Sequence, residues 1–196
     1  MRNALKVALV VLLVTVGCGG PFEDGVAAYY RGDYTTALRL IRPLAEQGDA
    51  AAQFWLGLMY DRGKGVPQDF AKAIKWYRLA ADQGDAPAQR HLGAMYEHGK
   101  GVPQDYAEAR KWVRQAAEQG YARAHYNLGV MHRDGLGVPR DYVLAHMWFN
   151  LATSHQPSKA LRDRAVLDHS AVAAKMTTAQ IAEAQQLARE WTEQHQ

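Results

Sequence analysis

One short motif recurs at a fixed interval along the chain. It reads GAMYEHGKGVPQD at 93–105, GLMYDRGKGVPQD at 57–69 and GVMHRDGLGVPRD at 129–141, so successive copies lie 36 residues apart. The same interval separates Trp76, Trp112 and Trp148. Self-similarity at a fixed period of this size is the signature of a repeat protein in which each unit stacks on the next.

The middle copy shows what one unit contains. Its apolar spacing predicts a first helix over 86–98, which the glycines and proline of the motif then end. Asp105 follows at an N-cap position, where a carboxylate accepts hydrogen bonds from the free N–H groups of the next turn. The second helix runs to about Gln119, and Gly120 stands where a left-handed C-terminal cap falls.

A glycine lies inside the first helix of each copy, at Gly57, Gly93 and Gly129. Glycine inside a helix costs about 1 kcal/mol relative to alanine. Its recurrence therefore indicates close approach of a neighbouring helix, with room for the tryptophan or tyrosine of the second helix. One helix pair cannot bury its apolar face alone, whereas stacked pairs bury a continuous core.

The full pattern is A-x-A-x-x-x-L-G-x-x-Y-x-x-G-x-G-V-x-x-D-x-x-x-A-x-x-W-x-x-x-A-A-x-x-G, and it resembles the Sel-one-like repeat (SLR), a relative of the tetratricopeptide repeat. In the middle copy its positions are filled by Ala86, Ala88, Leu92, Gly93, Tyr96, Gly99, Gly101, Val102, Asp105, Ala109, Trp112, Ala116, Ala117 and Gly120. The copy at 50–84 also fills every position. The third copy departs at His132, Thr153 and Gln156, which suggests the end of the array.

The resemblance implies an all-α fold, a right-handed α-solenoid of stacked antiparallel helix pairs similar to the tetratricopeptide superhelix. It also implies a protein-binding role, without chemistry of its own in most members. A composition of 48% hydrophobic and 22% charged residues agrees with a folded chain rather than a disordered one.

The period divides the chain into segments. We expect a signal peptide at 1–18, a tetratricopeptide-like capping repeat at 21–48, SLR repeats at 49–84, 85–120 and 121–156, and C-terminal capping helices at 157–196. The last helix opens with Thr177–Gln180, which has the form of a capping box. This helix, which carries Trp191, could instead be a docking peptide for a partner.

The first residues read as an export signal. Basic residues precede an apolar run, Val7–Val16, that is too short to cross a bilayer, since a spanning helix needs about 20 residues. The following Thr15–Cys18 is similar to a bacterial lipobox, in which the cysteine is lipidated. Cys18 is the only cysteine, and an unpaired cysteine in an exported protein needs such an explanation.

The expected location follows from this lipobox resemblance. We expect an exported, periplasmic protein held at the outer membrane by a lipid on Cys18, because no aspartate follows that cysteine. A signal peptide cut after about Gly20 and an uncleaved anchor are the alternatives.

Motifs for chemistry are not found. The loop glycines lack the G-x-x-x-x-G-K-[ST] spacing of a phosphate loop, and the eight histidines form no H-E-x-x-H. The periodic tryptophans read as core rather than as a sugar-binding platform. We therefore expect no catalytic residue, no metal and no cofactor. The formal charge of +3 is too small to indicate a nucleic-acid partner.

A partner surface is expected on the concave face, which the first helix of each pair lines in tetratricopeptide-like superhelices. By that analogy the exposed positions are Phe54, Leu58, Asp61 and Arg62, then Arg90, Ala94, Glu97 and His98, then Tyr126, Val130, Arg133 and Asp134. Aromatic residues and arginine are the usual anchors of protein interfaces. Arg90, flanked by Phe54 and Tyr126, would then hold an acidic or C-terminal peptide. The alternative is that these are solvated helix faces.

These features together predict a non-enzymatic scaffold or regulator of the bacterial cell envelope that binds another protein or peptide, with membrane contact through the lipid alone. Two alternatives remain. One is a protein that binds peptidoglycan fragments or acts on the cell wall, although a hydrolase needs convergent polar groups and the sequence shows none. The other is a secreted effector that binds a host protein.

Overall fold

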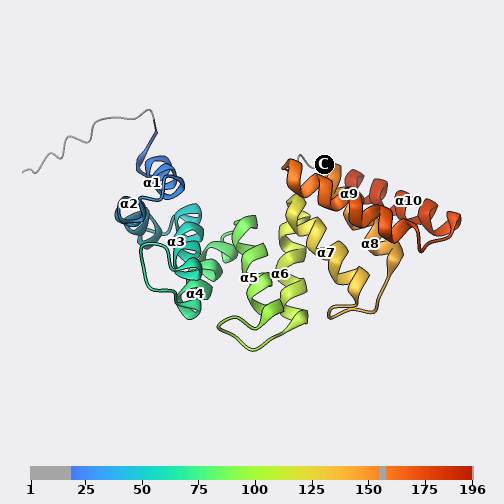
Figure 1. The fold of residues 1–196 in the computed structure, drawn as a ribbon, viewed down its shortest axis with the longest axis horizontal. Coiled ribbons are helices and arrows are strands. Elements are labelled where there is room, and N and C mark those ends of the chain that lie inside the picture. The colour runs from blue at the N-terminus through green and yellow to red at the C-terminus, as the bar shows by residue number, and fades with distance from the viewer. Residues whose placement is uncertain (1–18, 155–157, 196) are drawn as a thin grey trace, which may run out of the picture.

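The computed structural model describes residues 19–154 and 158–195, and within these ranges every regular element is an α-helix. The helices are α1 (Pro21–Tyr30), α2 (Tyr34–Glu46), α3 (Ala50–Arg62), α4 (Phe70–Asp82), α5 (Ala86–His98), α6 (Tyr106–Glu118), α7 (Ala122–Asp134), α8 (Tyr142–Ser154), α9 (Lys159–Ala173) and α10 (Thr178–Gln194). They follow one another along an arc from α1 to the C-terminal helices (Figure 1). The predicted all-α solenoid is confirmed.

Local capping sets the bounds of the repeat helices. The carboxylate of Asp105 accepts hydrogen bonds from the N–H groups of Ala107 and Glu108 and so begins α6. Gly99 ends α5 with φ +63°, a left-handed conformation that glycine adopts without steric cost. The helix predicted over 86–98 is therefore α5 itself.

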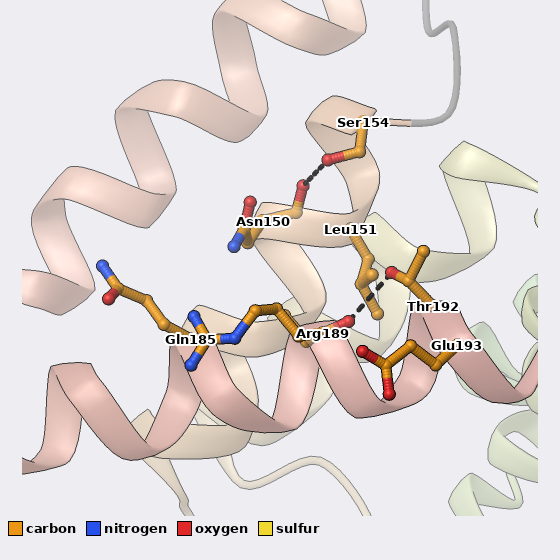
Figure 2. Close-up of a pocket in the computed structure, with 8 residues that line it drawn as sticks. Asn150, Leu151, Ser154, Gln185, Arg189, Thr192 and Glu193 are labelled. Carbon is orange, nitrogen blue, oxygen red and sulfur yellow. Dashed lines mark hydrogen bonds between the residues drawn. The ribbon is translucent and has the colours of Figure 1, made fainter.

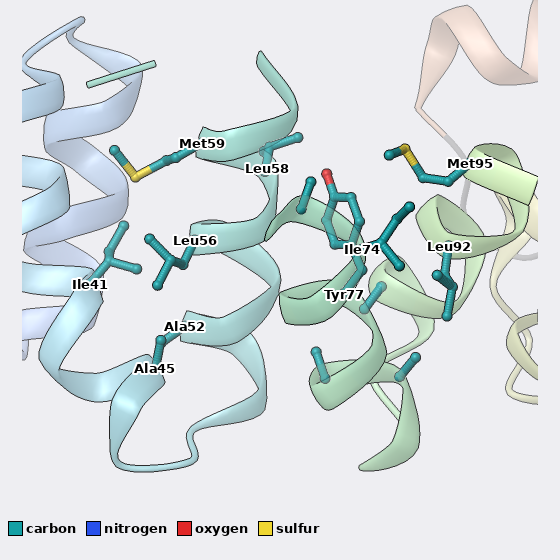
Figure 3. Close-up of a cluster of buried hydrophobic side chains, with 14 of the residues drawn as sticks. Ile41, Ala45, Ala52, Leu56, Leu58, Met59, Ile74, Tyr77, Leu92 and Met95 are labelled. Atoms are coloured by element: carbon teal, nitrogen blue, oxygen red, sulfur yellow. The ribbon is translucent and has the colours of Figure 1, made fainter. Parts of the chain in front are cut away.

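The core consists of three clusters, and the first of them spans several successive helices. Figure 3 shows side chains of α2, α3, α4 and α5 pointing into the space between these helices. The most deeply buried include Ile41, Leu56, Met59, Tyr77 and Leu92, each no more than 1% exposed. Because one cluster contains residues of α1 to α5, each pair depends on its neighbours for burial.

The helix glycines lie at close contacts between the two helices of a pair, as predicted. A Cβ atom on Gly57 would lie 2.8 Å from Cδ1 of Tyr77, and one on Gly129 would lie 2.6 Å from Cδ1 of Phe149. At Gly93 the nearest atom is Cγ2 of Val113, at 2.6 Å. The partner is thus the residue after each periodic tryptophan, so the expected tyrosine is correct for one copy and the expected tryptophan for none.

The second glycine of each loop joins neighbouring repeats. Gly101 has φ +72°, and a Cβ atom there would lie 2.7 Å from Cβ of Phe70, the first residue of α4 in the preceding repeat. A Cβ atom on Gly137 would meet Cβ of Tyr106 in the same way. These loops pack so tightly against the preceding second helix that a side chain has no space there.

A buried hydrogen-bonded ladder also connects the repeats. Gln53 donates through Nε2 to the carbonyl oxygen of Ala45 at 3.2 Å, and its Oε1 accepts from Gln83 Nε2 at 2.8 Å. The same two bonds recur one period later among Gln89, Ala81 and Gln119. In the third copy His125 takes the glutamine position, with Nε2 3.0 Å from the oxygen of Ala117. Each side chain thereby satisfies a carbonyl at the end of the preceding helix.

The two C-terminal helices both pack against α8. Val172 of α9 joins Phe149 in one buried cluster, whereas Trp191 of α10 lies edge-on to Trp148 with ring centroids 4.7 Å apart. The capping box is present, since Gln180 N donates to Thr177 Oγ1 at 3.3 Å and Thr177 N donates to Gln180 Oε1 at 2.9 Å. Trp191 therefore contributes to the chain's own core.

Candidate partner-binding cleft

A cleft of about 310 Å³ lies on the face formed by the first helices of successive pairs. It begins at the end of α1, crosses α3 and α5 and reaches the start of α7 (Figure 1 shows these helices in order along the arc). Its lining residues are Tyr29, Tyr30, Phe54, Trp55, Leu58, Arg62, Pro87, Arg90, His91, Tyr121 and Arg123. These residues are aromatic, apolar or cationic, and none is acidic.

Aromatic rings form a connected wall of the cleft. Trp55 lies 5.1 Å from Tyr29, 5.6 Å from Tyr30 and 5.9 Å from Phe54, measured between ring centroids. Phe54 continues the wall to His91, at 5.4 Å. Tyr30 is 76% exposed, which is high for a residue of this size. Exposed aromatic rings beside a cleft are a common feature of protein-binding surfaces.

Three arginines supply the positive charge of the cleft, Arg62 from α3, Arg90 from α5 and Arg123 from α7. Among the residues that the structure describes, none of the three forms an ion pair with a carboxylate. Burial lowers the pKa of Arg90, and the nearby Arg123 lowers it further, while the Tyr121 side chain opposes this shift. The Nε atom of Arg90 is buried without a hydrogen-bond partner.

His91 lines the cleft beside the arginines and also contacts Tyr77 of the core. Burial lowers its pKa to about 3, and the charges of Arg90, Arg62 and Arg123 act in the same direction. The imidazole is therefore neutral near pH 7 and stacks on Tyr77, with ring centroids 5.2 Å apart. His91 is part of the aromatic wall, and the arginines alone carry the positive charge.

The cleft depends on a departure from the repeat at Tyr121. Asp49 and Asp85 occupy the equivalent N-cap positions of α3 and α5, and each accepts a backbone hydrogen bond at 2.7 Å. Tyr121 makes no such cap for α7. An uncapped helix start is less stable by roughly 1 kcal/mol. The third repeat thus lacks the capping carboxylate of the other two repeats at a position beside Arg90.

Four of the residues predicted to bind a partner line this cleft: Phe54, Leu58, Arg62 and Arg90. The expectation that Leu58 is exposed is wrong, because it is 5% exposed and belongs to the core below the cleft. Tyr29, Tyr30, Trp55, Tyr121 and Arg123 were not among the predicted residues. The departure from the aspartate at position 121 was the one signal in the sequence that could have identified Tyr121.

The predicted residues of the third repeat lie away from the cleft. Tyr126 Oη donates to Asp168 of α9 at 2.6 Å, and Arg133 Nη1 pairs with the same carboxylate at 2.9 Å. Val130 packs against the buried cluster that holds Phe149. The placement of Tyr126 beside Arg90 is therefore corrected, since α9 uses this face of α7.

The remaining predicted positions also lie outside the cleft lining. Asp61 accepts a hydrogen bond from Tyr77 Oη at 3.3 Å, and the carbonyl oxygen of Glu97 accepts one from Gln104 at 2.7 Å. His98 is exposed at the end of α5, and Ala94 is half-buried on the same helix. Asp134 is exposed and pairs with the neighbouring Arg133.

A second pocket, of about 500 Å³, lies between α8 and α10 (Figure 2). Its lining includes Asn150, Ser154, Arg189, Thr192 and Glu193. The two hydroxyl groups donate to carbonyl oxygens of their own helices, Ser154 to Asn150 at 3.2 Å and Thr192 to Ala188 at 2.9 Å. Neither hydroxyl is placed against a base, so the pocket does not have the arrangement of a nucleophilic site.

Two histidines meet at the interface of α8 and α9. The rings of His146 and His169 lie 3.8 Å apart, measured between centroids. Burial, followed by the charge of His169, lowers the pKa of His146 to about 4. Within 19–154 and 158–195 no group of three or more His, Cys, Asp or Glu side chains could hold a metal ion. None of the helices described there is long and apolar enough to span a bilayer.

The stacked antiparallel pairs and the cleft across their first helices define the class: a repeat protein of the α-solenoid type. The family model described as Sel1 repeat matches residues 50–85, 86–121 and 122–156, which together are more than half of the chain. The chain belongs to the Sel1 repeat family. The resemblance seen in the sequence is thereby confirmed.

Solved structures of bacterial Sel1-type proteins are similar to this chain. A Sel1 repeat protein from Oxalobacter formigenes is 34% identical with a TM-score of 0.70, covering 78% of this chain and 59% of its own. The protein c5321, a protective antigen of uropathogenic Escherichia coli strains with an SLR fold, is 29% identical with a TM-score of 0.61. That match covers 89% of this chain and 45% of c5321, so the chain spans about half the length of these two proteins. No curated protein matches the sequence.

Proposed function

We propose that the protein is a non-enzymatic scaffold or regulator that binds a partner protein through the cleft across α1, α3, α5 and the start of α7. Sel1 repeats generally mediate protein–protein interaction, and members of the family are typically scaffolds without catalytic activity. The observation that carries the proposal is that an aromatic wall, with Tyr30 exposed and Phe54 and Trp55 half-buried, adjoins three arginines without carboxylate partners. Tryptophan, tyrosine and arginine contribute most of the binding energy in many protein interfaces.

The test is a crosslinked pulldown from an envelope extract, read by mass spectrometry. We expect the wild-type protein to capture a partner that a Phe54→Ala, Arg90→Ala, Arg123→Ala variant loses, because all three side chains line the cleft. A matched variant, Tyr126→Ala, Arg133→Ala, alters the α9 contact instead and should retain the partner. Both variants are first checked for native helicity. A partner that both variants retain would place binding elsewhere on the solenoid.

The cell envelope is the proposed location. Cys18 and the rest of 1–18 lie outside the described residues, so support comes from the basic and apolar start and the lipobox-like Thr15–Cys18. The similar c5321 is a protective antigen, which favours an exported protein. A lipid on Cys18 would hold the solenoid at the outer membrane, within reach of envelope complexes.

Lipidation gives a direct prediction. In a Cys18→Ser variant the thiol that accepts the lipid is absent, so labelling with a radioactive fatty acid should be lost and the protein should leave the membrane fraction. Thr15→Leu, which makes the motif more similar to a standard lipobox, should keep both properties. Membrane fractionation of Cys18→Ser that equals wild type would contradict the lipoprotein proposal and leave an uncleaved anchor or a membrane-bound partner as the explanation.

A further inference from the structure

The three arginines of the cleft come from three consecutive repeats. Arg62 lies at the end of α3, Arg90 in the middle of α5, and Arg123 in the first turn of α7. They occupy different positions of the repeat, so their convergence on one cleft is not a consequence of the period. Since each helix supplies one guanidinium group, the cleft presents several separate cations, not a single one.

None of these three arginines forms an ion pair with a carboxylate within the described part of the chain, and the Tyr121 side chain interacts with Arg90. Elsewhere in the described part of the chain, Arg133 and Arg164 pair with Asp168, and Arg114 pairs with Glu118. Beside Arg90 the chain carries Tyr121 where the two preceding repeats have an aspartate. The buried, unpartnered Nε of Arg90 adds an unsatisfied donor, and such a donor is unfavourable until an acceptor reaches it.

We propose that the cleft binds an acidic segment of the partner protein, an inference that rests on the proposed function. Side-chain carboxylates of that segment pair with Arg62, Arg90 and Arg123, and a neighbouring apolar side chain packs on the wall formed by Trp55 and Tyr30. Arginine pairs with carboxylates through two parallel hydrogen bonds, a strong and directional interaction. A volume of about 310 Å³ holds a few side chains, which suits a short segment.

The adjoining aromatic wall distinguishes a peptide from a small anion. A small anion would use the guanidinium groups alone and leave the rings of Tyr30 and Trp55 uncovered. A peptide that carries carboxylates beside an apolar residue uses both parts of the cleft at once. Several cations spread over three helices also fit several side-chain carboxylates better than the single carboxylate of a chain terminus.

The experiment uses two fluorescent peptide libraries, both blocked at each end, and the purified protein. One contains Glu, Leu, Trp and Gly, and the other has Gln in place of every Glu. Fluorescence anisotropy should show the Glu library binding about tenfold or more tightly than the Gln library.

Arg123→Ala and Arg90→Ala should each weaken Glu-library binding by about tenfold. Arg123 is exposed, so its variant tests the proposal even where Arg90→Ala disturbs folding.

The matched control is Arg110→Ala on α6. Arg110 is exposed, forms no ion pair in the described part of the chain and lines a different pocket, so this variant removes the same charge away from the cleft. Its binding should stay within about twofold of wild type, because Arg110 does not line the cleft and salt weakens the effect of exposed charges that make no direct contact.

Other outcomes overturn the inference in distinguishable ways. Equal binding of the two libraries would leave the cleft as a peptide site, as the proposed function requires, but without recognition of acidic side chains. A third library, the Gln peptides with a free C-terminus, is measured alongside, and binding of that library alone would assign the arginines to a terminal carboxylate instead. If none of the libraries bound, the acidic-segment inference would fail, whereas the proposed function would still be decided by the pulldown.

Discussion

A Gly93→Leu variant is expected to lose about 3 kcal/mol of stability, which for a chain of this length lowers the melting temperature by roughly 6–12 °C. The first added atom alone would lie 2.6 Å from Cγ2 of Val113 and 3.0 Å from the backbone oxygen of Ala109. The backbone atom cannot move without shifting α6 away from α5. The higher helix propensity of leucine offsets only about 1 kcal/mol of this loss.

The measurement is thermal unfolding followed by far-ultraviolet circular dichroism. Ala71→Leu serves as the control, because Ala71 is exposed on α4 and the larger side chain meets solvent there. That variant should stay within about 0.5 kcal/mol of wild type. Gly93→Ala should fall between the two, since it adds one atom to the same contact. A Gly93→Leu protein that melts at the wild-type temperature would show that α5 and α6 do not pack at this position.

The repeat helices could be predicted closely because their signals are local. An aspartate N-cap, a glycine C-cap and apolar spacing lie within each copy, so α5 could be bounded from its own residues. The close contact at Gly93 was also predictable, since a glycine inside a helix requires a reason. The side chain that faces Gly93 was not predictable. Whether Trp112 or Val113 faces it depends on how α6 is rotated about its own axis, and the repeat pattern does not specify this rotation.

The candidate site was less predictable, because it depends on what surrounds each repeat. Phe54, Arg90 and Tyr126 occupy the same position of the pattern, yet only the first two line the cleft. Tyr126 faces α9, and α9 lies beyond the last period, so the repeat contains no information about it. Arg123 and Tyr121 could not be identified from the helix-face analogy, since they lie at the start of α7.

The three periodic tryptophans occupy the same position of the repeat but differ in how deeply they are buried. This difference gives the second large prediction. Trp148 is 4% exposed, stacks on His125 at 5.7 Å and contacts Trp191. Trp76 is only partly buried at the edge of its cluster. Trp148→Ala should therefore cost about 3–5 kcal/mol, and Trp76→Ala clearly less. Urea unfolding followed by circular dichroism measures both, and equal losses would contradict the packing described here.

The same residues decide whether α10 belongs to the fold. Because Trp191 packs on Trp148, the losses in Trp148→Ala and Trp191→Ala should not add, and the double variant should reveal a coupling of at least about 0.5 kcal/mol. Trp76→Ala combined with Trp191→Ala is the matched cycle, and its two losses should add because Trp76 lies in a different cluster from Trp191. If α10 were a docking peptide that leaves the solenoid when free, Trp191→Ala alone would leave the unfolding free energy unchanged. A measurable coupling with Trp148 would instead mean that α10 covers the last repeat, so that Trp191 is held in the fold and is not free to dock on a partner.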